Sequence, residues 1–484
     1  MKKMITAALG LTMLGNTAIA APGEEAFVFE ERGGATVDAY RGSIQVQENR
    51  NNPDSRMIPV SYVRFPATGE HDGPPIIYLA GGPGGSGVAT AKYRRFKMFM
   101  AMRAYGDVIA LDQRGTGASN ILPECTSSQI VPPTKKISDA EYIAIERAAF
   151  DECFAFWKAE GVDVEGYNTV ENAWDIDALR QHLGADKVVL WGTSYGSHLA
   201  FAALKQMGDQ IEKVVLSSAE GLDQTIKLPA LTDRYFDRLQ AVVDQQPGLS
   251  AVYGDIKGLM RRVHAKLEAE PVLLHVTLED GATTDYLFHR RDMQRLASVF
   301  VSDPWGVKRL LAMYLAMDNG VVAPFEAVLG QWFIPGEPIK LDAMSNLMDV
   351  ASGMSDMRRN LVKTQAKDAL LADWLNFTYH YDGIAPELDL GDDFRAGPVS
   401  DVPVLLFSGT LDGRTYLEGQ EEATEGLSNL TRVIVENAGH NLFMSSDEVQ
   451  EAINHFMEGK PQPKSVITLE LPDLSPPPTI GEGQ

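Results

Sequence analysis

The feature that most constrains this chain is a pentapeptide with glycine at both ends, Gly192-Thr193-Ser194-Tyr195-Gly196. The apolar residues 188–191 precede it, and residues 197–206 have the composition of a helix. A serine between a strand and a helix in a Gly-x-Ser-x-Gly pattern lies on a sharp, strained turn that exposes its hydroxyl. The glycines leave room for the strand and the helix to approach closely. The pattern therefore predicts that Ser194 is a nucleophile.

Short apolar runs elsewhere in the chain indicate the kind of sheet that carries this turn. The runs are residues 75–79, 108–111, 188–191, 214–216, 402–407 and 433–435. They are continuous rather than alternating, which is typical of parallel strands covered on both faces. Helical patterns lie between them, for example residues 169–182. This alternation predicts a doubly wound, mostly parallel α/β sheet, and the alternating residues 26–66 predict antiparallel strands before it.

A serine hydroxyl needs a base that removes its proton and a carboxylate that orients the base. Asp412 follows the fifth apolar run and His440 follows the sixth. Both are therefore expected at the carboxyl ends of neighbouring strands, in the chain order that a Gly-x-Ser-x-Gly nucleophile requires. We predict that they complete a triad with Ser194. Weaker candidates for the acid, which precede the strand, are Asp401 and Asp392.

A glycine-rich loop, residues 80–87, follows the first apolar run. Acyl transfer needs N–H donors for the oxyanion of its tetrahedral intermediate, and here one donor is the residue after the nucleophile and the other comes from such a loop. The predicted donors are Tyr195 and Gly82, because Pro83 has no N–H. The alternatives for the second donor are Gly81 and Gly84. A phosphate-binding loop is disfavoured because no GxxxxGK[ST] pattern occurs.

Together these segments resemble the proline iminopeptidase and tripeptidyl aminopeptidase branch of the serine exopeptidases, which have the α/β-hydrolase fold. The matching stretches are residues 78–84, 112–119 and 167–196, with Asp412 and His440. The resemblance covers residues 40–220 and 395–460. It implies release of an N-terminal residue or short peptide without a cofactor. Ala80 stands where proline iminopeptidases have histidine, which points to the exported tripeptidyl type.

Between the fourth and fifth apolar runs the pattern becomes mainly helical. Residues 223–397 are therefore predicted to form a cap, inserted between a first core segment (21–222) and a second (398–470). The predicted cap helices are residues 232–245, 255–267, 292–300, 307–317 and 356–378.

Such enzymes bind the free amine of the substrate with cap carboxylates, and the sequence does not identify these here. Glu220, after the fourth apolar run, is a candidate for amine recognition from its position in the topology alone. A purely structural carboxylate is the alternative. Cap aromatics that are candidates for lining a pocket, although such residues more often pack helices, are Trp305, Tyr314, Trp332, Phe333 and Trp374.

Residues 1–20 have the pattern of a secretory signal peptide. Two lysines precede an apolar stretch that is too short to cross a bilayer, and an A-x-A pattern predicts cleavage after Ala20. We therefore expect a periplasmic or secreted protein without a membrane span. In that compartment the two cysteines of the chain, Cys125 and Cys153, are predicted to form a disulfide, with two free thiols as the alternative. The proline-rich residues 471–484 are predicted to be a loosely ordered tail.

Composition disfavours several classes of function. The formal net charge of −23 disfavours nucleic acid as a partner. No HExxH or CxxC pattern occurs, and the histidines lack the spacing of metal ligands, so no metal is expected. The remaining interpretations are an exopeptidase acting on peptides and a carboxylesterase or other ester or amide hydrolase with the same triad. A non-catalytic binding protein on this scaffold should have lost a triad member, and none is missing.

Overall fold

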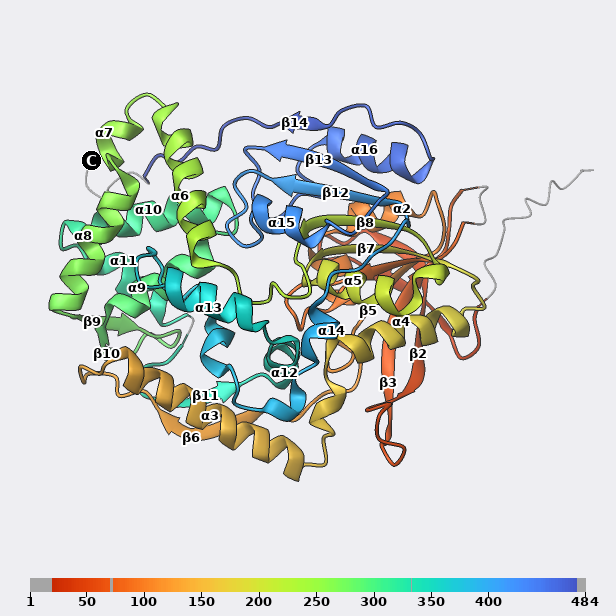
Figure 1. Cartoon of the computed structure of the whole chain (residues 1–484), viewed down its shortest axis with the longest axis horizontal. Helices are drawn as coiled ribbons and strands as arrows, with labels where there is room; N and C mark the ends of the chain where they lie inside the picture. The colour runs from red at the N-terminus through yellow and green to blue at the C-terminus, as the bar shows by residue number, and fades with distance from the viewer. Residues whose placement is uncertain (1–19, 70–72, 332, 477–484) are drawn as a thin grey trace, which may run out of the picture.

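The structure, a computed structural model, describes residues 20–69, 73–331 and 333–476 (Figure 1). The predicted signal peptide, apart from Ala20, lies outside these residues, as do Trp332 and residues 477–484 of the predicted tail. Among the described residues, no helix has both the length and the apolar composition needed to cross a membrane.

A ten-stranded sheet forms the centre of the described chain, in the order β1-β2-β3-β5-β4-β7-β8-β12-β13-β14. The strands are β1 (Glu25–Glu30), β2 (Thr36–Gln47), β3 (Met57–Phe65), β4 (Ile76–Leu79), β5 (Val108–Leu111), β7 (Val188–Ser194), β8 (Ile211–Ala219), β12 (Val404–Gly409), β13 (Leu430–Glu436) and β14 (Val466–Thr468). The pairs from β5 to β14 are parallel, and those from β1 to β5 by way of β2 and β3 are antiparallel. The predicted fold class is confirmed, and all six apolar runs overlap strands of this sheet.

The apolar runs are continuous because helices cover both faces of the sheet. Successive side chains of a strand point to opposite faces. In β4, Ile77 and Leu79 pack in one hydrophobic cluster, and Ile76 and Tyr78 pack in another on the opposite face. The helices on the first face are α4 (Thr169–His182) and α5 (Tyr195–Met207), and those on the second are α1 (Gly87–Tyr93), α2 (Phe96–Met102) and α16 (Asp447–Met457). One more α-helix of the core, α15 (Leu417–Ala423), lies between β12 and β13 in the chain.

The inserted residues 223–397 lie beside the carboxyl ends of the parallel strands (Figure 1). Their helices are α6 (Pro229–Asp244), α7 (Leu249–Tyr253), α8 (Ile256–Ala269), α9 (Arg290–Phe300), α10 (Pro304–Asp318), α11 (Ala323–Leu329), α12 (Ala343–Ser352), α13 (Asp356–Gln365), η3 (Phe377–Tyr381), η4 (Pro386–Leu388) and α14 (Gly391–Arg395). Their strands are β9 (Val272–Thr277), β10 (Thr283–Phe288) and β11 (Pro338–Leu341). A separate hydrophobic cluster, which includes Tyr235, Leu259 and Leu310, holds most of these helices together.

The helix expected over residues 356–378 is wrong in its second half, because α13 ends at Gln365. The chain then turns so that Leu370 and Leu371 enter the hydrophobic cluster of the insertion. Asp233 of α6 fixes this turn by accepting a hydrogen bond from the Leu370 N–H, at 3.0 Å. Tertiary packing therefore overrides the helical pattern of this segment.

Part of the predicted first core segment contacts the insertion. Strand β6 (Cys125–Ile130) pairs antiparallel with β11, and α3 (Asp139–Ala159) packs against both strands. The predicted disulfide between Cys125 and Cys153 is present and joins β6 to α3, with the two Cα atoms 5.6 Å apart. Strand β6 and helix α3 therefore contact the insertion, although Cys125 and Cys153 also belong to the hydrophobic cluster on the first face of the core sheet.

The beginning of the proline-rich tail is not loosely ordered. Leu474 is fully buried in the hydrophobic cluster of the insertion, and its carbonyl accepts a hydrogen bond from the Tyr253 hydroxyl at 2.7 Å. Asp473 forms an ion pair with Lys308 at 2.6 Å. The prediction followed the proline content and gave too little weight to this single leucine.

Candidate active site

Ser194 lies at the sharp turn that its flanking glycines predict. It is the last residue of β7 and the N-cap of α5, and its backbone is strained, with φ of 56° and ψ of −129°. A Cβ at Gly192 would lie 2.6 Å from the Gly196 carbonyl oxygen, and a Cβ at Gly196 would lie 2.1 Å from that of Leu79. A larger side chain at position 192 would therefore push β7 away from α5, and one at position 196 would push α5 away from β4.

The structure brings Asp412 and His440 together. They lie in the loops after β12 and β13, and the His440 Nδ1 atom is 2.9 Å from Oδ2 and 3.1 Å from Oδ1 of Asp412. The weaker candidates, Asp401 and Asp392, precede β12, and Asp392 pairs with Arg395. Asp412 is buried, whereas the His440 side chain keeps 15% of its surface exposed. An imidazole that is held at Nδ1 and open to solvent has the arrangement of a general base.

The Asp412 carboxylate is held in its ionised form. Its Oδ1 atom accepts hydrogen bonds from the N–H groups of Arg414 (2.8 Å) and Thr415 (2.9 Å), and Oδ2 accepts one from the Thr415 hydroxyl at 2.6 Å. Burial alone would raise the pKa of Asp412, but the neighbouring His440 and the Thr415 hydrogen bonds lower it below its usual value. Sequence reasoning did not identify Thr415, although a hydroxyl three residues after the acid was visible there.

The three loops meet at one edge of the sheet because β7, β8, β12 and β13 are consecutive parallel neighbours. The backbone at Ser194 is anchored to this edge. The Ser197 hydroxyl donates to the Ser194 carbonyl oxygen and accepts a hydrogen bond from the Glu220 N–H at 2.8 Å. The sheet order therefore places Ser194, Asp412 and His440 along one edge.

The glycine-rich loop after β4 lies directly against Ser194. A Cβ at Gly81 would lie 3.1 Å from the Ser194 Cβ, and the Gln113 side chain holds the loop through a hydrogen bond to the Ala80 carbonyl oxygen at 2.9 Å. Gly82 has a φ of 133°, which favours glycine. The Tyr195 N–H belongs to the first turn of α5, where N–H groups have no partner within the helix. Both predicted oxyanion donors therefore lie on segments that contact Ser194.

Glu220 lies beside the nucleophile turn, as its place after β8 predicts, but it does not present a free charge. It is buried, and its carboxylate forms an ion pair with Lys227. Burial would raise the pKa of Glu220, but the charges of Lys227 and His198 lower it. Burial and the neighbouring Glu220 raise the pKa of partly buried Asp349 to about 8. This cluster offers little net negative charge to a substrate amine, which weakens the expectation for Glu220.

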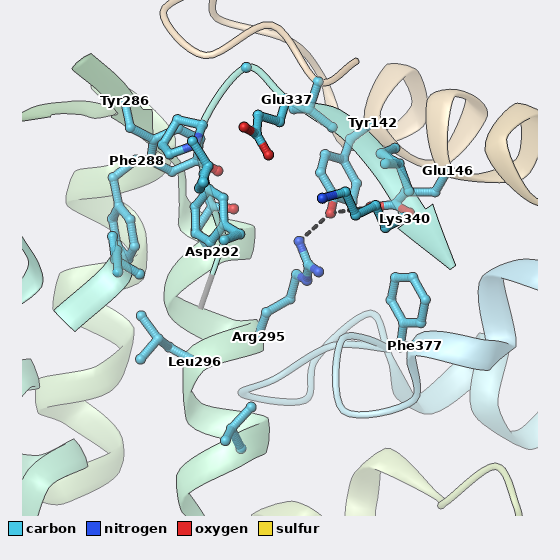
Figure 2. A pocket seen from close by; sticks show the side chains of 18 of the residues that line it. Tyr142, Glu146, Tyr286, Phe288, Asp292, Arg295, Leu296, Glu337, Lys340 and Phe377 are labelled. Atoms are coloured by element: carbon cyan, nitrogen blue, oxygen red, sulfur yellow. Dashed lines mark hydrogen bonds between the residues drawn. The ribbon is translucent and has the colours of Figure 1, made fainter. Parts of the chain in front are cut away.

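A cavity of about 720 Å³ lies between the insertion and α3 (Figure 2). Its walls come from α3, β10, α9, η3, Leu329 and residues 333–341, and they are mainly aliphatic and aromatic. Of the cap aromatics named from the sequence, Phe333 and Trp374 line this cavity, Tyr314 is buried in the cap core and Trp305 is exposed. Ligand sites in proteins typically have this size and lining.

The charged residues of the cavity have a small acidic excess. Three carboxylates (Glu146, Asp292, Glu337) and two cations (Arg295, Lys340) line it, which leaves a formal excess of one negative charge. Glu146 accepts a hydrogen bond from the Tyr142 hydroxyl, and Asp292 accepts one from the His289 N–H. The Glu337 side chain is exposed and its carboxylate points into the cavity (Figure 2). Sequence reasoning did not identify these acids, since they come from three separate segments.

The cavity is bordered by elements that touch the catalytic loops. Ser298, in the last turn of α9, lines it, and its carbonyl oxygen accepts a hydrogen bond from Arg414 at 3.2 Å. On another wall, Leu341 leads into α12, whose Ser345 would be 3.6 Å from a Cβ at Gly84. The cavity walls therefore continue to both the acid loop and the glycine-rich loop.

Two family models match this chain. One, described as the α/β hydrolase fold, matches residues 74–257, and the other, described as TAP-like protein, matches residues 392–466. With the sheet and the nucleophile turn, these matches show that the chain has the α/β hydrolase fold. Within that class, the second core segment is similar to the TAP-like proteins.

The sequence relatives of this chain are named as peptidases. The chain is 27% identical over 187 residues to serine protease Hip1 of Mycobacterium bovis, which covers 37% of this chain and 36% of that protein. It is also 27% identical over 187 residues to the tripeptidyl aminopeptidase of Streptomyces lividans. That match covers 37% of this chain and 34% of the aminopeptidase. The matched region therefore spans about a third of the length of these relatives. The resemblance to this branch is confirmed at that extent.

Solved structures overlap with the chain over most of its length. Epoxide hydrolase A of Mycobacterium thermoresistibile is 16% identical, with a TM-score of 0.39, over 87% of this chain and 99% of that one. A proline iminopeptidase-related protein of Thermus thermophilus is 15% identical, with a TM-score of 0.38, over 87% and 97%. At these TM-scores the overlaps add nothing to the family matches.

Proposed function

We propose that this protein is a serine exopeptidase that releases short peptides from the N-termini of its substrates. The observation that carries the proposal is the bonded pair of His440 and Asp412 at the same sheet edge as the strained Ser194 turn. A large cavity with an acidic excess supports it, because Ser298 in its wall contacts the acid loop. The names of the two sequence relatives support the same class of reaction.

In the proposed reaction, His440 takes the proton of the Ser194 hydroxyl as the oxygen attacks the scissile carbonyl carbon. The N–H groups of Tyr195 and Gly82 stabilise the oxyanion. His440 then gives its proton to the leaving amine, and water hydrolyses the acyl-enzyme. Asp412 stays ionised and holds the imidazole with its proton on Nδ1. Every catalytic side chain and N–H donor in these reaction steps belongs to this chain.

The carboxylates of the cavity are better receptors for a substrate amine than Glu220. An ammonium group binds where negative charge is in excess, and Lys227 already neutralises Glu220. The cavity has room for several residues of a peptide, so an amine bound there suits release of a short peptide better than release of one amino acid. We therefore assign amine recognition to Glu337 together with Asp292.

Glu337→Gln tests this assignment. Because Glu337 is exposed, we expect its loss to raise KM for a free-amine tripeptidyl anilide by only about two- to fivefold, with kcat unchanged. Lys340→Met is the matched control, since it removes a charge of opposite sign from the same wall. An unchanged KM in Glu337→Gln, or equal increases in both variants, would remove Glu337 from amine recognition.

A carboxylesterase with the same triad is the second candidate. The observation that favours it is the aromatic and aliphatic lining of the cavity, which would also accept the acyl chain of an ester. Export to the periplasm or beyond is also proposed. It is supported by the signal pattern of residues 1–20 and by the Cys125–Cys153 disulfide, since disulfides persist in oxidising compartments.

The deciding experiment compares three substrate classes with the purified protein: tripeptidyl and aminoacyl p-nitroanilides with a free amine, the same compounds N-acetylated, and p-nitrophenyl esters. We expect the free-amine tripeptidyl anilides to be cleaved fastest and acetylation to lower kcat/KM at least about tenfold, the ratio for one lost charged contact. Turnover of esters alone, without dependence on a free amine, would replace the exopeptidase with the esterase.

A further inference from the structure

His440 is fixed by hydrogen bonds at both of its peptide groups as well as at its ring. Its N–H donates to the Ser302 carbonyl oxygen and its own carbonyl oxygen accepts a hydrogen bond from the Ser218 hydroxyl, each at 2.8 Å. Ser218 is the next-to-last residue of β8 in the core sheet and has an unusual φ of 55°. Ser302 lies in the turn between α9 and α10 of the insertion. The proposed base is therefore held from the core on one side and from the insertion on the other.

Asp303 extends this contact to the next residue of the histidine loop. Its Oδ1 atom accepts a hydrogen bond from the Asn441 N–H at 3.2 Å, and Oδ2 accepts one from the Asn441 side-chain amide at 2.7 Å. The two segments are so close that a Cβ at Gly439 would lie 2.6 Å from the Asp303 Oδ1 atom. A carboxylate of the insertion thus holds the loop that carries His440.

The same turn also contacts the loop of the acid. Arg414, two residues after Asp412, donates a hydrogen bond to the Ser298 carbonyl oxygen at 3.2 Å. A Cβ at Gly413 would lie 2.2 Å from the Val301 carbonyl oxygen. We call residues 298–303 the cap turn. It touches the loops of both Asp412 and His440, and its first residue lines the cavity.

We propose that the cap turn, acting through Asp303, is a positioning element that keeps His440 aligned with Ser194. Asp303 touches no reacting atom and acts through Asn441. On this view the insertion both encloses the substrate and completes the geometry of the base, so the triad is competent only while the cap turn is docked. This inference rests on the proposed roles of Ser194, Asp412 and His440.

A small shift of a catalytic group has a large effect, because a misplacement of about 1 Å can cost about 100-fold in rate. Asp303→Ala removes both hydrogen bonds to Asn441 and leaves the Ser302–His440 bond in place. We therefore expect kcat to fall about 10- to 100-fold. The readout is hydrolysis of p-nitrophenyl acetate, a small ester that needs neither a free amine nor the cavity. KM should change less than twofold, because Asp303 does not contact the substrate.

The matched control is Asp318→Ala. Asp318 ends the same helix, α10, and pairs with Arg262 and Lys266, away from the catalytic loops. We expect this variant to keep its kcat even where its melting temperature falls. The partner variant, Asn441→Ala, removes only the side-chain hydrogen bond, because its backbone N–H still donates to Asp303. It should therefore lower kcat by less than Asp303→Ala, and the double variant should lose no more than Asp303→Ala alone.

Four outcomes are decisive. A drop in kcat confined to Asp303→Ala and Asn441→Ala, without additivity, supports the proposal. An Asp303→Ala protein that keeps kcat within twofold overturns it, as do equal losses in Asp303→Ala and Asp318→Ala that follow the melting temperature. Additive losses in the double variant also overturn it. By contrast, wild-type turnover by Ser194→Ala would refute the proposed function itself.

Discussion

Each proposed catalytic group depends on a few neighbouring atoms. Ser194 needs glycine at positions 192 and 196, and Asp412 needs the donors of Arg414 and Thr415. Thr415 stands out because its hydroxyl hydrogen-bonds the same carboxylate oxygen that faces the His440 ring most closely, at 2.6 Å and 2.9 Å respectively. A hydroxyl at this position both orients and stabilises the carboxylate.

We predict that Thr415→Val lowers kcat about tenfold or more, because a hydrogen bond to a charged group contributes about 1.5–3 kcal/mol. Valine has the same shape and keeps the backbone donor, so the fold should be retained. Thr415→Ser, which keeps a hydroxyl, should restore most of the rate. Steady-state kinetics on one chromogenic substrate decides the matter, and equal rates for the valine variant and the wild type would show that the hydroxyl is dispensable.

At the residue scale, the sequence alone was sufficient to predict the Asp412–His440 pair and the Ser194 turn, but not their surroundings. Each of these residues, Ser194, Asp412 and His440, follows an apolar run. Their order along the chain is the one that places a serine, an acid and a histidine at the same edge of an α/β sheet. The ion pair of Glu220 with Lys227 and the contact of Asp303 with Asn441 join positions whose distance depends on tertiary packing. No local pattern encodes such pairs, and for that reason the sequence left Glu220 open as a candidate for amine recognition.

At the element scale, the continuous apolar strands and the helices with clear ends were predictable. Residues 169–182 and 108–111 match α4 and β5, because those elements are buried on defined faces. The hairpin of β9 and β10 was not predicted, since the sequence pattern around it is helical and the strands are half exposed. The helix over 356–378 was overextended, because the contact between Leu370 and Asp233 is long-range.

The packing of α8 against α10 predicts a pH dependence of cap stability. His264 of α8 is buried and its Nε2 atom lies 2.8 Å from the Tyr314 hydroxyl of α10. Burial, with a smaller effect of Arg290, lowers the pKa of His264 to about 4. Between pH 6.5 and 4 the unfolded state therefore binds a proton that the folded state does not. The free energy of unfolding should fall by about 3 kcal/mol as the pH drops through this window.

The measurement is denaturant unfolding at pH 7.5 and pH 4.5 for the wild type and His264→Gln. We expect the glutamine variant to lose much of the pH dependence. His275→Gln is the control, because His275 lies on β9 of the same insertion but is 66% exposed. A glutamine variant of His264 with the full pH dependence of the wild type would show that other groups cause it.

On the scale of the whole molecule, the chain crosses between core and insertion more often than the sequence indicates. Strand β6 pairs with β11 of the insertion while Cys125 packs in the hydrophobic cluster of the core, and the residues after β14 contact the insertion. Core and insertion are therefore connected by these contacts as well as by the chain at the two ends of residues 223–397. The sequence predicted a single insertion because no sequence pattern in segments 125–159 and 471–476 indicates contact with the insertion rather than with the core.

The tail crossing predicts a stabilising role for Leu474. Its side chain is fully buried in the hydrophobic cluster of the insertion, so Leu474→Ala should lower the free energy of unfolding by about 2 kcal/mol or more. Leu471→Ala, in the same tail but 39% exposed, should have little effect. Thermal melting and limited proteolysis of the two variants compare them directly. Equal stability of both variants would show that the tail does not hold the insertion.

The most direct test of the whole account is covalent labelling of the protein with a fluorophosphonate, followed by mass spectrometry of the digested product. A working triad makes Ser194 far more nucleophilic than any other hydroxyl of the chain. We predict one adduct, on the peptide that contains Ser194, with labelling slowed strongly in His440→Ala and absent in Ser194→Ala. An adduct on another residue, or equal labelling rates in the wild type and His440→Ala, would contradict the proposed active site.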